Sequence, residues 1–545
     1  MKKRSSSRAS TPRLKTRAKT TPRPAARTPD SAIDLATARA PDAVDPARQA
    51  AEPRAAADVL TLDDAIAFLK TTRPTFYRWL RDGRIKAYKA GRQWRFQRDD
   101  LERFLKGHQP RVDLPVSLAP LIDALRDRLA AAGQTPDPRD DDPLTHAVRL
   151  MIKLAYYQRA SDLHIAPHFE PTPTADEPRD RWSAMLRFRI DGLLHEILRF
   201  DLRLLPAVIE RWKTFCALDV AEARVSQDGR MHASVDGHEI DIRVCIVPAN
   251  GGPTLTARLL RPDALHFDLA DIGYSDADLH RLQAACRSRS GLILVAGPTG
   301  TGKTTTLYSC LMQLASPAVK IMTVEDPIEY VLPYTVQVPL NPAAGMTFPL
   351  AMRSFLRSGT DAIMVGEIRD NETLQLCPQA ALTGHLVFTT LHAEDTARAL
   401  RRCLEIGLPH FLLADTAVLL LAQRLLRKLC PHCSQSVELS QEEQRQAAEI
   451  ATRGGLGREM LAGDFRRPVG CAKCGDIGFA GRVVAAETIR MTPALAAAIR
   501  ADKSADDLRA IAIADGTTTM AADALRKAAA GLTTLTEIHR VLGGL

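Results

Sequence analysis

The stretch LILVAGPTGTGKTT, residues 292–305, decides the fold of this 545-residue chain. Its first five residues are apolar and predict a strand, a glycine-rich turn follows, and Leu307 and Leu311 continue as a helix. This is the P-loop pattern in the setting that it requires, with a strand before the turn and a helix after it. Glycines let backbone N–H groups converge on phosphate oxygens, and the start of the helix adds a positive potential. The sequence therefore predicts a phosphate-binding loop made of Gly297, Pro298, Thr299, Gly300, Thr301, Gly302, Lys303, Thr304 and Thr305.

Two side chains at the end of this loop complete a nucleotide site. Lys303 brings a full positive charge for the β- and γ-phosphates of a bound nucleotide. The Thr304 hydroxyl can bind Mg²⁺. The loop therefore predicts Mg²⁺ beside the phosphates.

Three further apolar segments follow, at residues 320–324, 362–365 and 386–391, and helical patterns separate them. This alternation predicts a parallel sheet, and we assign residues 266–429 to an α/β domain. Polar side chains stand at the ends of these strands: Glu325, Glu367, and the pair His385 and His392. Acidic groups at the carboxyl ends of such strands can order a metal ion or an attacking water molecule.

Residues 144–265 show a different pattern. Apolar residues from Leu144 to Ala155 recur at helical spacing, and segments at 184–190, 193–198 and 239–247 alternate like strands. We expect a mixed α+β domain here, preceded by a linker over residues 109–143 that carries one helix near 118–131. The longest apolar run, residues 414–421, is too short to span a membrane and is interpreted as a buried helix.

Seven stretches between residues 144 and 490 resemble the ATPases of type II secretion and of type IV pilus assembly and retraction. They are ASDLHI (160–165), FRIDG (188–192), QDGR (227–230), the phosphate loop, VEDPIEY (324–330), MVGEIRD (364–370) and TGHLVF with TLH (383–392). The resemblance implies a RecA-like ATPase core behind a PAS-like α+β domain, with ATP as the nucleotide. It also implies that Glu367 positions the attacking water, that Glu325 helps at the metal, and that His385 and His392 sense the nucleotide or a neighbouring subunit.

Three arginines of the α+β domain match basic positions of that family: Arg230, Arg243 and Arg258. Guanidinium groups suit the charge that develops on a γ-phosphate, so these residues are candidate phosphate clamps. The alternative for each is a structural salt bridge with Asp228 or Asp241. The chain departs from the family at residues 358–360, which read SGT in place of QDP, at Glu394 in place of Asn, and at residues 252–253. None of these changes removes a phosphate or metal ligand, but they leave the turnover rate open and allow a poorly active variant.

Two CxxC pairs point to a metal site. Cys430 with Cys433 and Cys471 with Cys474 are separated by thirty-seven residues, and two such turns can close a tetrahedral Cys₄ zinc site. A redox CxxC is the rival interpretation, although one pair would suffice for it. Similar motor ATPases carry the same tetracysteine insertion. We assign residues 430–492 to this structural zinc module and residues 493–545 to a helical tail.

The amino-terminal region is strongly basic. Residues 1–57 read as a disordered basic arm, with a minor role in touching anionic lipid or nucleic acid left open. Residues 58–108 predict two helices, a hairpin that turns at residues 90–91 and a last helix, and they resemble winged helix-turn-helix domains of the excisionase and MerR type. Candidate DNA contacts are Arg73, Arg78, Arg81, Arg92 and Arg95. Protein docking is the equal alternative, because family motors place a docking domain at this end.

The resemblance implies a homo-oligomeric ring, a hexamer, that works in the cytoplasm and reaches the inner membrane through platform proteins. Such a ring would power type II secretion or assembly of a pilus-like fibre, with ATP, Mg²⁺ and structural Zn²⁺ as its cofactors. Two alternatives stay open at this point. One is a DNA-translocating or conjugation-type motor, and the other is a regulator in which nucleotide binding switches a DNA-binding domain.

Overall fold

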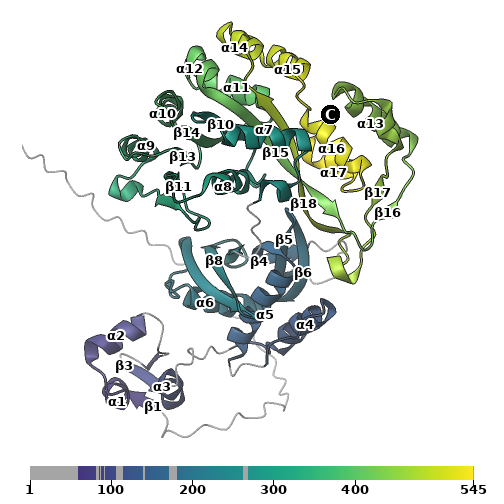
Figure 1. The fold of residues 1–545 in the computed structure, drawn as a ribbon. Coiled ribbons are helices and arrows are strands. Elements are labelled where there is room, and N and C mark those ends of the chain that lie inside the picture. Colours follow the sequence, from purple (N-terminus) through teal and green to yellow (C-terminus); the bar gives the residue numbers. More distant parts are fainter. Residues whose placement is uncertain are drawn as a thin grey trace, which may run out of the picture. The chain divides into compact units, whose positions relative to one another are not determined.

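The computed structural model describes residues 59–543, apart from residues 82–84, 86, 91–92, 106–113, 139–141, 171–180 and 262–267. The basic arm predicted for residues 1–57 lies outside the described part of the chain. Four sheets, of three, six, seven and two strands, organise the described residues (Figure 1). Within these ranges no helix is both long and apolar enough to cross a lipid bilayer.

A small domain of three helices and three short strands comes first. Its elements are β1 (Val59–Thr61), α1 (Leu62–Phe68), α2 (Arg73–Arg81), β2 (Tyr88–Ala90), β3 (Gln93–Gln97) and α3 (Arg98–Leu105). Phe76 of α2 packs edge-on against Phe96 of β3, with ring centroids 5.1 Å apart, and both side chains are fully buried. The helix-turn-helix fold predicted from the sequence is confirmed. Strand β1 was not expected, because three residues are too few to show an alternating pattern.

The next domain packs helices against a six-stranded antiparallel sheet in the order β6-β5-β4-β9-β8-β7. Its elements are α4 (Ala119–Ala131), α5 (Pro143–Tyr157), β4 (Ala160–Glu170), β5 (Arg181–Ile190), β6 (Leu193–Asp201), α6 (Leu205–Phe215), β7 (Gln227–Val235), β8 (His238–Val247) and β9 (Thr254–Leu260). Helix α4 falls in the segment interpreted as a linker, yet its residues Leu121, Leu125 and Leu129 are buried in the same core as α5. The prolines and acids around α4 resemble a linker, whereas its apolar face makes it part of this domain.

A seven-stranded sheet forms the largest domain, in the order β12-β11-β13-β14-β10-β15-β18. Its strands are β10 (Gly291–Ala296), β11 (Ile321–Glu325), β12 (Thr335–Pro339), β13 (Ala362–Val365), β14 (Leu386–Leu391), β15 (Ala417–Leu429) and β18 (Phe479–Arg490). The helices are α7 (Asp276–Cys286), α8 (Lys303–Leu314), α9 (Phe348–Phe355), α10 (Asn371–Leu382), α11 (Thr396–Glu405) and α12 (His410–Thr416) (Figure 1). The strand pairs of this sheet are parallel, as the alternating sequence pattern predicted, apart from β15 with β18. That last pair is antiparallel.

The apolar run at residues 414–421 is not a helix, so that prediction is wrong. Helix α12 ends at Thr416, and the run continues as β15, which lies between β10 and β18. Its residues Leu419 and Leu421 pack with the cluster that contains α7 and α8, and Leu420 packs on the opposite side. A strand that is buried on both faces is apolar throughout, so its sequence shows no period by which to tell it from a buried helix.

The cysteine-bearing segment is inserted between β15 and β18. It contains β16 (Gln435–Ser436), α13 (Gln441–Arg453) and β17 (Arg466–Arg467). Strand β18, which the sequence placed with the cysteine module, instead extends the main sheet by pairing with β15. The helical tail comprises α14 (Pro493–Arg500), α15 (Ala505–Ala514), α16 (Met520–Ala529) and α17 (Leu535–Leu542). Buried Glu537 of α17 pairs with Arg427 of β15 at 2.9 Å, which fixes the tail to the sheet.

Candidate functional site

The glycine-rich loop joins β10 to α8 and has the curled backbone that phosphate binding requires. Gly297, Gly300 and Gly302 have φ values of 156°, 79° and 85°, a region that favours glycine. A Cβ atom at Gly297 would lie 2.6 Å from the Thr301 hydroxyl oxygen and 2.9 Å from the Gln423 carbonyl oxygen, so only glycine fits. The loop ends at the first turn of α8, whose free N–H groups face the same region. The residues present therefore fit a phosphate group.

Lys303 reaches back across the loop from the first turn of α8. Its ammonium group donates to the carbonyl oxygens of Gly297 at 2.8 Å and Pro298 at 2.9 Å. Burial lowers the pKa of Lys303, the nearby Glu367 carboxylate opposes this shift, and Arg424 adds to it. Thr304 follows and is half-buried. The lysine and the threonine thus lie at the end of the loop, and their contacts with phosphate and Mg²⁺ stay predictions.

A buried glutamine that the sequence did not reveal holds the loop in place. Gln423 of β15 donates its amide N–H to the Thr301 carbonyl at 2.8 Å. Its amide oxygen accepts from the Tyr274 hydroxyl at 2.9 Å and the Thr306 hydroxyl at 3.0 Å. A buried polar group left without a partner costs about 1–3 kcal/mol, so this network favours one loop conformation. No motif marks a single glutamine in a strand, and only the fold brings it to the loop.

Charged side chains meet where β11, β13 and β14 end. Glu367 accepts from Arg369 at 2.6 Å, and Arg369 also binds Asp326 at 2.8 Å. The His392 Nε2 atom lies 3.7 Å from the second oxygen of Glu367. The structure thus brings together Glu367 and His392, which were predicted as site residues, with Arg369 and Asp326, which were not.

The side chains of Glu325 and His385 make other contacts. Glu325 is only 3% exposed, and its carboxylate accepts from Thr323 at 2.5 Å, from Gln337 at 3.0 Å and from the Tyr308 hydroxyl. Glu325 stands at the carboxyl end of β11, as predicted, but its carboxylate forms no hydrogen bond or ion pair with Glu367 or His392 in the described part of the chain. It links α8 and β12 instead. The His385 Nδ1 atom lies 3.0 Å from the Ala380 carbonyl oxygen, at the opposite end of β14 from His392. At the usual rise of a strand these two histidines are about 20 Å apart.

The three predicted arginines stand in one row across the antiparallel sheet. Arg230 of β7 faces Arg243 of β8, and Arg243 faces Arg258 of β9. Paired residues of neighbouring strands share a face of the sheet, so their charges repel one another. Burial lowers the pKa of Arg243, and the Arg230 charge adds to the shift.

Among the described residues, none of these arginines forms a salt bridge with Asp228 or Asp241, which was the alternative interpretation. Arg258 pairs with Asp162 at 2.9 Å, and Arg243 donates to the carbonyl of Ile328 at 2.7 Å. For Arg230 the described residues offer no ion pair. The row therefore keeps an excess of positive charge, which suits an anion.

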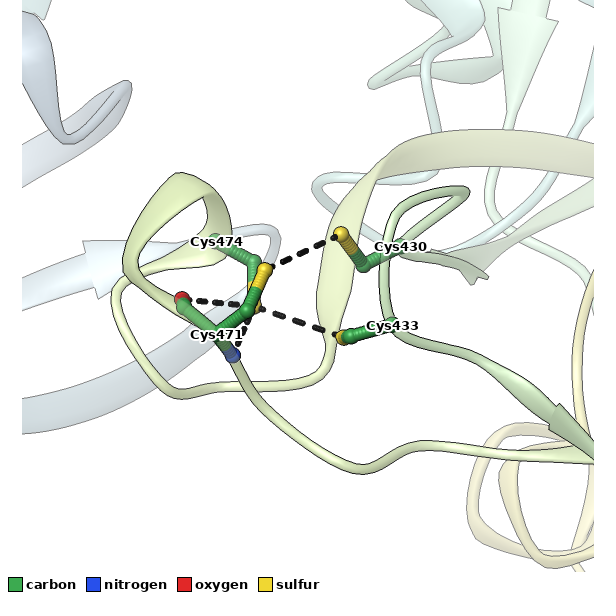
Figure 2. Close-up of side chains that lie close together, drawn as sticks. All are labelled: Cys430, Cys433, Cys471 and Cys474. Carbon is green, nitrogen blue, oxygen red and sulfur yellow. Dashed lines mark hydrogen bonds between the residues drawn. The ribbon is translucent and has the colours of Figure 1, made fainter.

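The four cysteines converge on one point, as Figure 2 shows. All four Sγ atoms lie within 4.8 Å of one another, with 3.9 Å between Cys430 and Cys471 and 3.9 Å between Cys433 and Cys474. The backbone N–H of Gly470 points at the Cys433 sulfur at 3.3 Å, and that of Gly478 at the Cys474 sulfur at 3.2 Å. Such N–H···S bonds favour thiolates, so the site fits Zn²⁺.

The candidate DNA contacts are only partly described. Arg73 is exposed and pairs with Asp63, and Arg78 is exposed on α2. Arg95 of β3 donates to the Gln93 side chain at 2.8 Å. Arg92 and the side chain of Arg81 lie outside the described residues. Of the three aromatic residues of α2, Phe76 is buried, Trp79 packs on Phe104, and Tyr77 is 43% exposed.

Comparisons with known proteins agree with this geometry. Residues 137–540 match the family described as type II/IV secretion system protein, and residues 59–109 match a helix-turn-helix domain. The chain is 38% identical to type II secretion system protein E of Dickeya dadantii over 76% of its own length and 79% of that protein. It is 35% identical to the type IV pilus assembly ATPase PilB of Myxococcus xanthus over 81% of its own length and 75% of that protein.

A solved structure shows the same fold. The Legionella pneumophila ATPase DotB superposes with a TM-score of 0.51 at 19% identity, over 74% of this chain and 96% of that one. The predicted α/β core behind an α+β domain is therefore a fold that this chain shares with a known ATPase. From its sequence and its fold, the chain belongs to the family of type II/IV secretion system proteins.

Proposed function

We propose that this chain is an ATP-hydrolysing ring motor that powers type II secretion or the assembly of a type IV pilus-like fibre. The observation that carries the proposal is the strand-end cluster beside the phosphate loop, in which Glu367 lies 3.7 Å from His392 and its carboxylate opposes the lowering of the Lys303 pKa by burial. A carboxylate at this strand end would orient a water molecule toward a bound terminal phosphate. The relatives named for secretion and pilus assembly support this choice.

Each group has a defined task in this proposal. The loop N–H groups and Lys303 hold the phosphates, and the Thr304 hydroxyl offers an oxygen to Mg²⁺, which neutralises phosphate charge when bound. Glu367 orients the attacking water, and Arg369 and His392 hold the Glu367 carboxylate in position. We also propose that Glu325 helps at the metal, although its carboxylate first has other partners to release.

The arginine row and the zinc module serve the assembled ring. Arg230, Arg243 and Arg258 supply positive charge that would clamp the γ-phosphate when two domains close. The Cys₄ site would brace the segment between β15 and β18 as a contact for platform proteins of the inner membrane. We propose a homohexamer in the cytoplasm, attached to the membrane through those partners.

The function is tested by complementation. In a strain that lacks the gene, the wild-type gene is expected to restore secretion of its substrates or pilus formation, and Lys303→Ala is expected to restore neither. Equal protein levels on immunoblots control for expression. Restoration of DNA transfer alone would favour the conjugation-type motor, and full restoration by Lys303→Ala would favour a regulator that needs no hydrolysis.

A second role, binding of duplex DNA through the helix-turn-helix domain, is favoured by the domain match and by the exposed Arg73 and Arg78 of α2. The full-length protein should then bind DNA with an affinity that falls steeply with salt, and Arg78→Ala should reduce the log–log salt slope by about 1. Fluorescence anisotropy measures this, with Arg490→Ala, an exposed arginine of β18, as the control. Undetectable binding at low salt would leave protein docking as the role of this domain.

A further inference from the structure

Arg424 of β15 is a half-buried cation whose bonding is unusual. Its guanidinium donates to the carbonyl oxygens of Gln423 at 3.0 Å and Glu394 at 3.1 Å, and neither acceptor is charged. In the described part of the chain it forms no ion pair with a carboxylate. Burial lowers the pKa of Arg424, and the Asp395 carboxylate, which pairs with Arg509, only partly opposes this shift.

Other arginines around the same cavity are neutralised. The cavity has a volume of about 1030 Å³ and is lined by Pro298, His392 and Arg424 together with residues of the helical tail. Four further arginines of the lining each pair with a carboxylate: Arg398 with Glu394, Arg453 with Glu449, Arg509 with Asp395, and Arg540 with Glu537. Of the five arginines that line this cavity, Arg424 is therefore the one without an ion pair among the described residues.

The guanidinium lies directly beside the phosphate loop. The Gln423 carbonyl oxygen that accepts from Arg424 is the same atom that would lie 2.9 Å from a Cβ at Gly297. One carbonyl oxygen thus separates Arg424 from the first residue of the loop, and the Lys303 ammonium group binds the carbonyl oxygen of that same residue. Two cations therefore lie close to Gly297, and the Arg424 charge lowers the pKa of Lys303.

We infer that Arg424 is a further phosphate-binding residue of the nucleotide site and that it contacts the terminal phosphate of a nucleoside triphosphate. The inference rests on the proposed function. Two cations held close together repel each other, and a polyanion that binds near both relieves that repulsion. Arg424 uses two of its five N–H donors on carbonyls, which leaves others for phosphate oxygens. A terminal phosphate would gain this contact, whereas a diphosphate, which is shorter by that group, would gain less.

The test compares nucleotide affinities of the full-length protein. Fluorescently labelled ADP and a labelled non-hydrolysable ATP analogue are titrated against wild type, Arg424→Gln, Arg424→Lys and the control Arg453→Gln. Arg424→Gln is expected to weaken binding of the analogue about tenfold and of ADP less than threefold, because charge-assisted bonds contribute most to the triphosphate. Arg453→Gln should match wild type, and Arg424→Lys, which keeps the charge without the planar fork, should fall between.

Several outcomes overturn the inference. An equal loss of affinity for both nucleotides would show that Arg424 only supports the loop. Unchanged affinities would show that Arg424 has no role in nucleotide binding. If Arg424→Gln shows no cooperative unfolding transition, it is not folded, and the test then uses Arg424→Lys. A ratio of analogue affinity to ADP affinity in Arg424→Lys that equals the wild-type ratio would refute the contact. Wild type that binds neither nucleotide would instead refute the proposed function, so the two failures are distinguishable.

Discussion

Replacement of Glu367 by glutamine is expected to lower ATP turnover by about 100-fold or more while nucleotide affinity stays within a factor of about three. Glu367 lies at the end of β13, held by Arg369 at 2.6 Å with His392 3.7 Å away. Glutamine keeps the size of the side chain but loses the negative charge that orients and polarises the attacking water. Binding persists because the loop backbone and Lys303 hold the phosphates. Phosphate release in steady state and titration with a labelled nucleotide measure the two effects separately.

The matched control for this variant is Glu442→Gln. Glu442 lies in the first turn of α13, and its exposed carboxylate pairs with Arg445 of the same helix. The control should hydrolyse ATP at the wild-type rate, because an exposed pair of this kind contributes about 0–1 kcal/mol to stability and lies outside the site. If Glu367→Gln keeps more than a third of wild-type turnover, another group orients the water.

Replacement of Cys471 by serine is expected to remove bound zinc almost completely, from about one ion per chain to less than about a tenth of that. Four sulfurs within 4.8 Å form the site, and a serine hydroxyl is a far weaker ligand than a thiolate. Without the ion the two turns lose the link between the ends of β15 and β18, so the thermal unfolding midpoint should fall as well. Metal analysis of the purified protein and a thermal melt measure both results.

Cys245→Ser is the control for the cysteine prediction. Cys245 is a free, partly buried cysteine on β8 outside the cluster, and its loss should leave the zinc content unchanged. Wild-type protein without zinc, whose midpoint responds to reductant and not to chelator, would contradict the zinc site. That result would favour the redox pair that the sequence left as the alternative.

The parts of the site whose residues are neighbours in the chain could be predicted from the sequence. The phosphate loop is encoded in nine consecutive residues, and Glu367 and His392 each follow a strand that shows a clear apolar pattern. Each CxxC pair likewise lies within one turn. In such cases the residues that act together are neighbours in sequence, or end parallel strands at a common edge.

The parts of the site that could not be predicted depend on contacts between segments that are distant in the sequence. Gln423 and Thr301 are 122 residues apart, and no motif links them. The arginine row depends on the register of β7, β8 and β9, and a shift of one residue would turn the side chains to the other face. The side-chain contacts of His385 and Glu325 could not be predicted for a related reason. His385 precedes β14 and lies at the other end of that strand from His392, and the carboxylate of Glu325, which ends β11, is buried.

The rate of ATP hydrolysis by the full-length protein tests the central claim most directly. The assembled wild-type ring and Lys303→Ala are compared at equal concentration in Mg²⁺, and oligomeric state is checked by light scattering in the same samples. We predict a steady turnover by wild type that falls by at least about 100-fold in Lys303→Ala, because the alanine cannot neutralise phosphate charge. Turnover that is absent from an assembled wild-type ring, or that does not depend on Lys303, would contradict the assignment of this protein as an ATP-driven motor.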